Sequence, residues 1–188
     1  MEEIITIGLD LAKQVFQVHG ADEEGNAVLR KQLRRGAVLE FFAKLAPCRV
    51  GMEACGGAHY WAREIAALGH EVKLMPPAYV KPYVKRGKND AADAEAICEA
   101  VRRPSMRFVP IKSAEQQANA LIYKTRELLV RQRTQLVNAL RAHLSEFGIV
   151  AARGLGKLAE LRAVVHDDND ARLPQAVRLG LEIGRAHV

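Results

Sequence analysis

The chain has 188 residues, of which 49% are hydrophobic and 27% are charged, and its formal net charge is +6 at pH 7. This composition is that of a globular protein and argues against wholesale disorder. No apolar run reaches the roughly 18 residues that a membrane-spanning helix needs, so no membrane partner is expected. The excess of basic over acidic residues favours a polyanionic partner, because such a partner is attracted electrostatically.

Two features of the sequence indicate a cytoplasmic protein. The N-terminal stretch Met1–Ile4 is acidic and enters a predicted strand at once, so it is not a signal peptide. Cys48, Cys55 and Cys98 are odd in number and lack the spacing of a zinc site, which indicates reduced thiols and no disulfide framework.

Five stretches in the first half of the chain have the pattern of β-strands. Their residues are β-branched and apolar, or alternate between apolar and polar. Turn residues at 22–26 join the second and third stretches, so the first three strands are expected to form an antiparallel meander. The predicted strands span 4–10, 15–20, 27–33, 49–54 and 71–75.

Helices are predicted between and after these strands, at 38–45, 56–68 and 90–102. Three antiparallel strands followed by helix, strand, helix, strand and helix is the element order of a ribonuclease-H-like fold. We therefore expect an α/β domain with a mixed five-stranded sheet, followed by a long helix and a short helical tail.

The long helix is predicted because Ser113 to Phe147 contains no Pro or Gly and has apolar residues at spacings of three, four or seven. A helix of this length cannot be covered by a small domain, so we expect it to pair with a second copy of the chain. Two interpretations of its basic residues stay open, namely nucleic-acid binding and solubility of a coiled coil. These residues are Lys124, Arg126, Arg131, Arg133 and Arg141.

The predicted organisation has four parts. Beyond the long helix, helical patterns at 158–165 and 173–181 flank a polar loop at 166–170. The last seven residues resemble the translation of a sequencing adapter, and we exclude them from the fold. The parts are an α/β domain at 1–112, the long helix at 113–148, the start of a truncated helical region at 149–181, and a non-native tail at 182–188.

Asp90 and Asp93 stand three residues apart in an Ala-rich predicted helix, so both carboxylates project from one face. Like charges on adjacent turns weaken a helix, and Mg²⁺ between them would reverse that penalty because it prefers carboxylate oxygen. The alternative is a solvated helix start, with Asp90 as the N-cap or a first-turn acid. The preceding segment is basic and either contacts phosphate or forms a solvated face; its residues are Lys81, Lys85, Arg86 and Lys88.

Asp10 and Glu53 each end a predicted strand, where a single acid is usually an exposed cap or turn former. If the two strands are parallel neighbours, their carboxyl ends meet at one edge, and the last helix could deliver Asp90 and Asp93 there. Four converging carboxylates cannot all stay ionised without cations. Two Mg²⁺ ions about 4 Å apart would neutralise them and clamp the attacking and leaving oxygens of a phosphodiester.

Three spaced motifs carry a resemblance to a known family. They occupy 8–13, 51–61 and 88–94, and read GLDLAK, GMEACGGAHYW and KNDAADA. The chain resembles the DEDD transposases of bacterial insertion sequences, the "IS one-ten" group, also called bridge recombinases. The resemblance implies a RuvC-like domain whose catalytic, metal-binding tetrad is Asp10, Glu53, Asp90 and Asp93. Mg²⁺ is the implied cofactor, with Mn²⁺ as a substitute.

The resemblance also implies a bacterial enzyme that cleaves and exchanges DNA strands under the guidance of a structured noncoding RNA. It implies a homo-oligomer, a dimer or tetramer, held partly by the long helix. One departure concerns a second, C-terminal domain with a nucleophilic serine, which is missing, since Ser105, Ser113 and Ser145 lie outside any matching motif. We therefore expect nucleic-acid and metal binding from half of a composite site, without complete recombination. The expected nucleic-acid contacts are Lys13, Lys81, Lys85, Arg86 and Lys88.

Two other functions stay open. One is a stand-alone Mg²⁺-dependent, structure-specific nuclease such as a junction resolvase, against which the long helix and abrupt ending argue. The other is a non-catalytic nucleic-acid-binding dimerisation module whose acids are structural. His59 either touches DNA or metal or packs beside Tyr60 and Trp61, and packing is favoured. Cys55 is expected to pack as well, because no basic partner would activate its thiol.

Overall fold

The computed structural model describes residues 3–84, 90–152 and 154–183. The chain divides into two compact units, Met1–Gln117 and Ala118–Val188.

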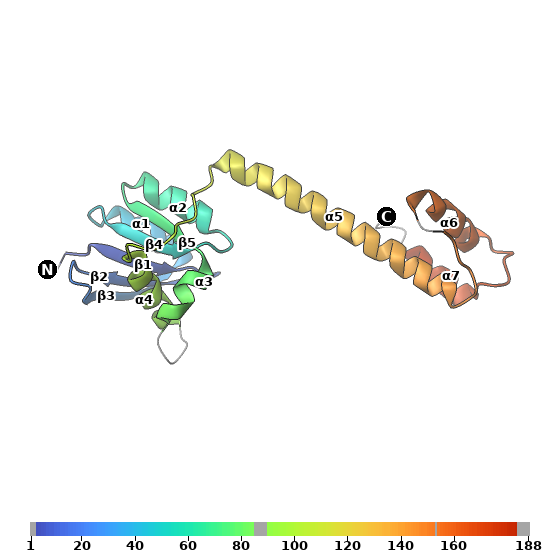
Figure 1. Cartoon of the computed structure of the whole chain (residues 1–188), viewed down its shortest axis with the longest axis horizontal. Helices are drawn as coiled ribbons and strands as arrows, with labels where there is room; N and C mark the ends of the chain where they lie inside the picture. The colour runs from blue at the N-terminus through green and yellow to red at the C-terminus, as the bar shows by residue number, and fades with distance from the viewer. Residues whose placement is uncertain (1–2, 85–89, 153, 184–188) are drawn as a thin grey trace. The chain divides into compact units, whose positions relative to one another are not determined.

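A mixed five-stranded sheet lies at the centre of the first unit (Figure 1). The order across the sheet is β3-β2-β1-β4-β5, with antiparallel pairing of β1 to β2 and β2 to β3, and parallel pairing of β1 to β4 and β4 to β5. This confirms the predicted ribonuclease-H-like, RuvC-like fold, including the opening meander. The strands are β1 (Thr6–Asp10), β2 (Val15–Ala21), β3 (Ala27–Arg34), β4 (Arg49–Glu53) and β5 (Glu71–Met75).

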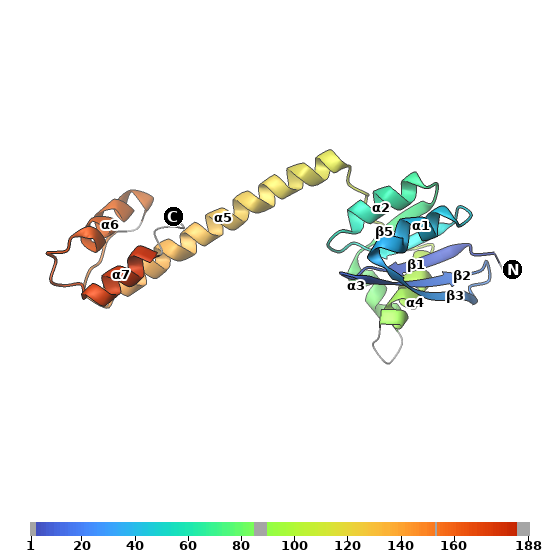
Figure 2. The ribbon, with the colours of Figure 1, turned by 180° about the vertical axis from the view of Figure 1, so that it is seen from behind.

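Helices cover both faces of the sheet (Figures 1 and 2). Side chains alternate along each strand, so Ile7 and Leu9 of β1 point to the same face as Val50 and Met52 of β4. These four side chains are fully buried in the main core, beneath α1 and α2. The opposite face is covered by α4. The bounds are α1 (Val38–Ala43), α2 (Ala58–Ala67) and α4 (Asp90–Val101).

Helix α4 approaches the sheet closely because two strand residues facing it are glycines. A Cβ atom on Gly8 would lie 2.5 Å from the backbone nitrogen of Cys98 and closer still to the carbonyl oxygen of Ala94. A Cβ atom on Gly51 would lie 2.8 Å from the Cβ atom of Val101. Because the contacts at Gly8 include helix backbone, no rotamer change could relieve them. Gly8 and Gly51 therefore fix the height of α4 above β1 and β4.

In the described part of the first unit, three short helical segments were not predicted from the sequence. They are η1 (Arg35–Ala37), α3 (Pro77–Val80) and η2 (Lys81–Tyr83). The pair Pro76-Pro77 ends β5 as expected, but Pro77 also opens α3, since the first turn of a helix does not need its amide hydrogen. After α4 the chain returns along β5, where the Val109 amide donates a hydrogen bond of 2.8 Å to the Leu74 carbonyl.

The second unit consists of most of α5 (Ala114–Ser145), followed by η3 (Leu155–Lys157), α6 (Leu158–His166) and α7 (Gln175–Ile183). Leu144, Leu161 and Leu173 are among the residues that form its own small core. Arg178 is only 2% exposed, and its guanidinium donates to the carbonyls of Val164 and Val165 at the end of α6. None of the helices in these described ranges is long and apolar enough to cross a membrane.

Candidate active site

The carboxyl edge of the sheet, where β1 and β4 end, brings Asp10 and Glu53 together. Leu9 of β1 is paired with Met52 of β4, so the next residue of each parallel strand reaches the same edge. By strand alternation, Asp10 points to the face of Gly8 and Glu53 to the face of Gly51, which is the face that α4 covers. Both acids are half-buried.

Helix α4 brings Asp93 to the same place. Its neighbour Ala94 lies against Gly8, two residues before Asp10. Burial raises the pKa of Glu53, and the negative charge of Asp93 raises it further. Asp93 therefore lies near enough to Glu53 for its charge to act there. We call Asp10, Glu53 and Asp93 the acid cluster.

The fourth predicted acid, Asp90, is the first residue of α4. Its side chain is outside the described part of the structure, and the basic residues Lys85, Arg86 and Lys88 lie outside the described residues altogether.

The donor set of the acid cluster fits a hard divalent cation. All three groups are carboxylates, the ligands that Mg²⁺ prefers. Burial is the first cause of the raised pKa of Glu53 and repulsion from Asp93 is the second, and a bound cation would remove that repulsion. Among the side chains that the structure describes, which do not include that of Asp90, no group of three His, Cys, Asp or Glu is arranged to hold a metal ion.

Cys55 lies just beyond Glu53, in the loop that leads to α2. Its side chain is exposed, so the expectation that it packs is wrong. Partial desolvation, followed by the charges of Glu53 and Asp10, raises the pKa of its thiol. A protonated thiol is a poor nucleophile, which agrees with the expectation that Cys55 is not reactive.

His59 holds the segment that precedes α5. Its Nδ1 accepts a hydrogen bond of 3.2 Å from the backbone amide of Lys112, whose carbonyl accepts one of 2.8 Å from Arg63. Neither sequence interpretation of His59 included this contact. The two partners are 53 residues apart, and no local pattern announces such a contact.

Basic side chains surround the carboxyl edge. The predicted contact Lys13 is exposed in the turn after Asp10, and Lys81 is exposed at the start of η2. Sequence reasoning missed Arg34 and Arg35, which are also exposed. Arg34 pairs with Val15 at the end of β3, and the meander carries that end to the same edge as Asp10. The sequence feature that could have pointed to them is the pair of consecutive arginines directly after a predicted strand of the meander.

The family model for DEDD transposases of the IS110 type, described as "Transposase", matches residues 7–149. The chain belongs to this transposase family. A Pseudomonas aeruginosa protein named "Probable family 20 transposase" is 62% identical over 147 residues, which are 78% of this chain and 44% of that protein. The "Transposase for insertion sequence element IS1328" of Yersinia enterocolitica is 45% identical over 179 residues, or 95% of this chain and 53% of the relative.

The chain spans about half the length of the curated relatives that it matches. The family resemblance inferred from the three motifs is thus confirmed, and the matched region contains all four predicted acids. A solved structure, "T. thermophilus RuvC in complex with Holliday junction substrate", covers 57% of this chain and 100% of its own, with a TM-score of 0.43 and 13% identity.

Proposed function

We propose that this transposase chain carries the metal-binding half of an active site for DNA strand cleavage and exchange. The proposed tetrad is Asp10, Glu53, Asp90 and Asp93, with Mg²⁺ as the natural ion and Mn²⁺ as a substitute. The observation that carries the proposal is the meeting of Asp10 and Glu53 at the carboxyl edge of two parallel strands, with Asp93 close enough to raise the pKa of Glu53.

When bound, Mg²⁺ would stabilise the charge that develops on the attacking and leaving oxygens of a phosphodiester. Several residues of the chain shape this site. Gly8 and Gly51 let α4 come close enough to present Asp93 beside the strand ends. Glu53, whose pKa is raised by burial and by the charge of Asp93, holds its proton more tightly than a free carboxyl, so a cation that binds there would compete with that proton. Lys13 and Lys81, both exposed, would contact the phosphates of the strand.

The whole protein would need further components besides the metal site. We propose that a structured noncoding RNA guides strand exchange, and that a serine nucleophile comes from a C-terminal domain of the whole protein. On this view, residues 1–112 bind metal and DNA, 113–148 join copies of the chain, and 149–181 begin the next helical region. Residues 182–188 take no part. The chain alone would bind its partners without completing recombination.

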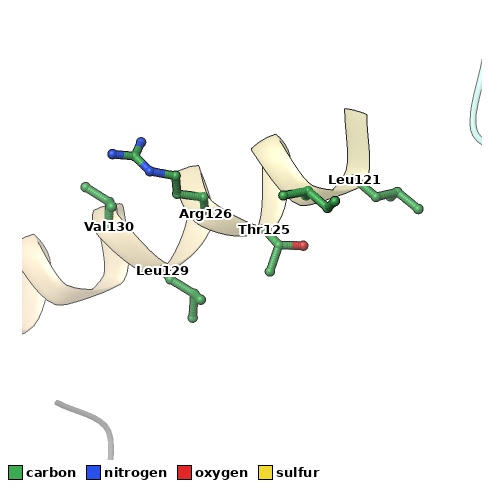
Figure 3. Close-up of a pocket in the computed structure, with 6 residues that line it drawn as sticks. Leu121, Thr125, Arg126, Leu129 and Val130 are labelled. Carbon is green, nitrogen blue, oxygen red and sulfur yellow. The ribbon is translucent and has the colours of Figure 1, made fainter. Parts of the chain in front are cut away.

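Helix α5 supports the proposed homo-oligomer, a dimer or tetramer. Several of its large apolar side chains are exposed, among them Leu121 at 55%. Figure 3 shows the open surface lined by Leu121, with Thr125 and Leu129 on one side of the helix and Arg126 and Val130 on another. Apolar residues at helical spacing on an uncovered helix are what a second copy of α5 would bury.

Calorimetric titration with Mg²⁺ or Mn²⁺, with and without a DNA duplex, tests the proposed metal site. We expect saturable binding by the wild-type chain and its loss in Asp90→Asn/Asp93→Asn. The matched control is Glu23→Gln/Glu24→Gln, which removes the same charge from the exposed β2–β3 turn of the same unit and should bind like the wild type. Absence of binding by the wild type, even with DNA present, would refute the metal site.

A further inference from the structure

A second feature of the carboxyl edge involves aromatic side chains. Tyr60 and Trp61 lie in the first turn of α2, immediately after the loop that follows Glu53. Arg35 follows β3 at the same edge, and its backbone amide donates a hydrogen bond of 2.8 Å to the carbonyl of Gln14 in the β1–β2 turn. The three side chains therefore come from two segments that meet at the carboxyl edge of the sheet.

The contacts among these side chains form a supported layer. Trp61 is 5% exposed, and its ring packs edge-on against the buried ring of Phe16, with centroids 5.1 Å apart. The guanidinium carbon of Arg35 lies 5.1 Å from the centre of the Trp61 ring, in a cation–π contact. Tyr60 also packs edge-on against Trp61, at 5.2 Å, yet 44% of it remains exposed. The buried rings thus hold an exposed tyrosine and an exposed arginine in place.

This combination matches the chemistry of an unpaired nucleobase. Aromatic rings and guanidinium planes are the two kinds of side chain on which single-stranded bases stack. A single exposed tyrosine would need no explanation. Here, however, it shares a buried support with Arg35, and the exposed Lys13 and Arg34 at the same edge supply positive charge that suits the phosphates on either side of a base.

We propose that Tyr60 and Arg35, supported by Trp61, form a stacking platform for an unpaired base of a nucleic-acid strand at the carboxyl edge. This inference rests on the proposed function, since a strand that reaches the acid cluster for cleavage must pass this edge. Bases outside a duplex have free faces, and the platform would hold one of them while its backbone runs toward the acids. The shared chemistry is that of a single strand, of DNA or RNA.

Binding of labelled single-stranded DNA and RNA of the same sequence, in EDTA, tests the platform apart from the metal site. We expect Tyr60→Ala to bind about tenfold more weakly, as is typical for the loss of one base stack, and Tyr60→Phe to bind like the wild type. Arg35→Lys, which keeps the charge but loses the plane, should weaken binding without changing its salt dependence. Trp61, the single tryptophan of the chain, should change its fluorescence on binding.

Leu68→Ala removes an exposed apolar side chain from the other end of the same helical segment and should leave binding unchanged. Equal affinity of Tyr60→Ala and the wild type, with unchanged thermal unfolding, would overturn the platform but leave the metal proposal standing. Failure of the wild-type chain to bind either single strand would also overturn the platform, and only loss of metal binding would count against the proposed function.

Discussion

At the scale of residues, the surroundings of Glu53 disfavour its ionised form when no cation is bound. Its pKa is raised in the folded state, so the folded protein binds a proton more tightly there than the unfolded chain does. This contribution to stability is fully present below the unfolded pKa and is lost as the pH rises through the folded pKa. Glu53 therefore destabilises the fold at neutral pH, and a divalent cation is expected to reverse the effect.

Asp93→Asn should raise the unfolding temperature at neutral pH in EDTA, because it removes one of the two causes of the raised Glu53 pKa. The difference from the wild type should shrink in acid, where Glu53 is protonated in both proteins. Added Mg²⁺ should stabilise the wild type more than the variant, since binding to the folded state shifts the equilibrium. Thermal unfolding across this pH range measures all three effects. A lower unfolding temperature of Asp93→Asn in neutral EDTA would contradict this account.

At the scale of elements, the site depends on how closely α4 lies on β1. Gly8→Ala would push a methyl group into the backbone of α4, at Ala94 and Cys98. We expect a loss of about 1–3 kcal/mol in the free energy of unfolding, as for other overpacked cores, and weaker metal binding because Asp93 moves. Urea unfolding monitored by Trp61 fluorescence measures the first effect.

The control for this substitution is Gly36→Ala, because nothing lies within 4 Å of a Cβ atom at Gly36. It should change the free energy of unfolding little. Equal stability of the two variants would show that the contact between Gly8 and α4 does not set the position of the helix.

Local sequence patterns were enough to predict the strands and the longer helices. Individual contacts between residues far apart in the sequence could not be predicted. The alternation of Ile7 and Leu9 with Gly8 marks β1 and its buried face, and acids at strand ends followed from where β1 and β4 stop. The sequence does not reveal that Gly8 is a docking surface for α4, because the other side of that contact is 86 or more residues away. The hydrogen bond between His59 and Lys112 escaped prediction for the same reason.

At the scale of the whole molecule, the exposed apolar side chains of α5 predict self-association. Leu121→Glu/Leu128→Glu should shift the chain toward monomer, because two charges would have to be buried at the proposed helix pairing. Gln132→Glu/Gln135→Glu adds the same charge at exposed polar positions of α5 and is the control. Sedimentation velocity over a range of concentrations measures the distribution. A wild-type chain that remains monomeric throughout would refute pairing through α5.

We propose that the strand-end acids and the α4 acids form one metal site. Titration of Mn²⁺ followed by electron paramagnetic resonance tests it most directly in Asp10→Asn/Glu53→Gln, the pair complementary to the α4 variant. We expect the wild type to bind Mn²⁺ and this variant, although folded, to lose at least about tenfold in affinity, since ligands contributed by two different elements are both required. Equal Mn²⁺ binding by the wild type and this variant would contradict it.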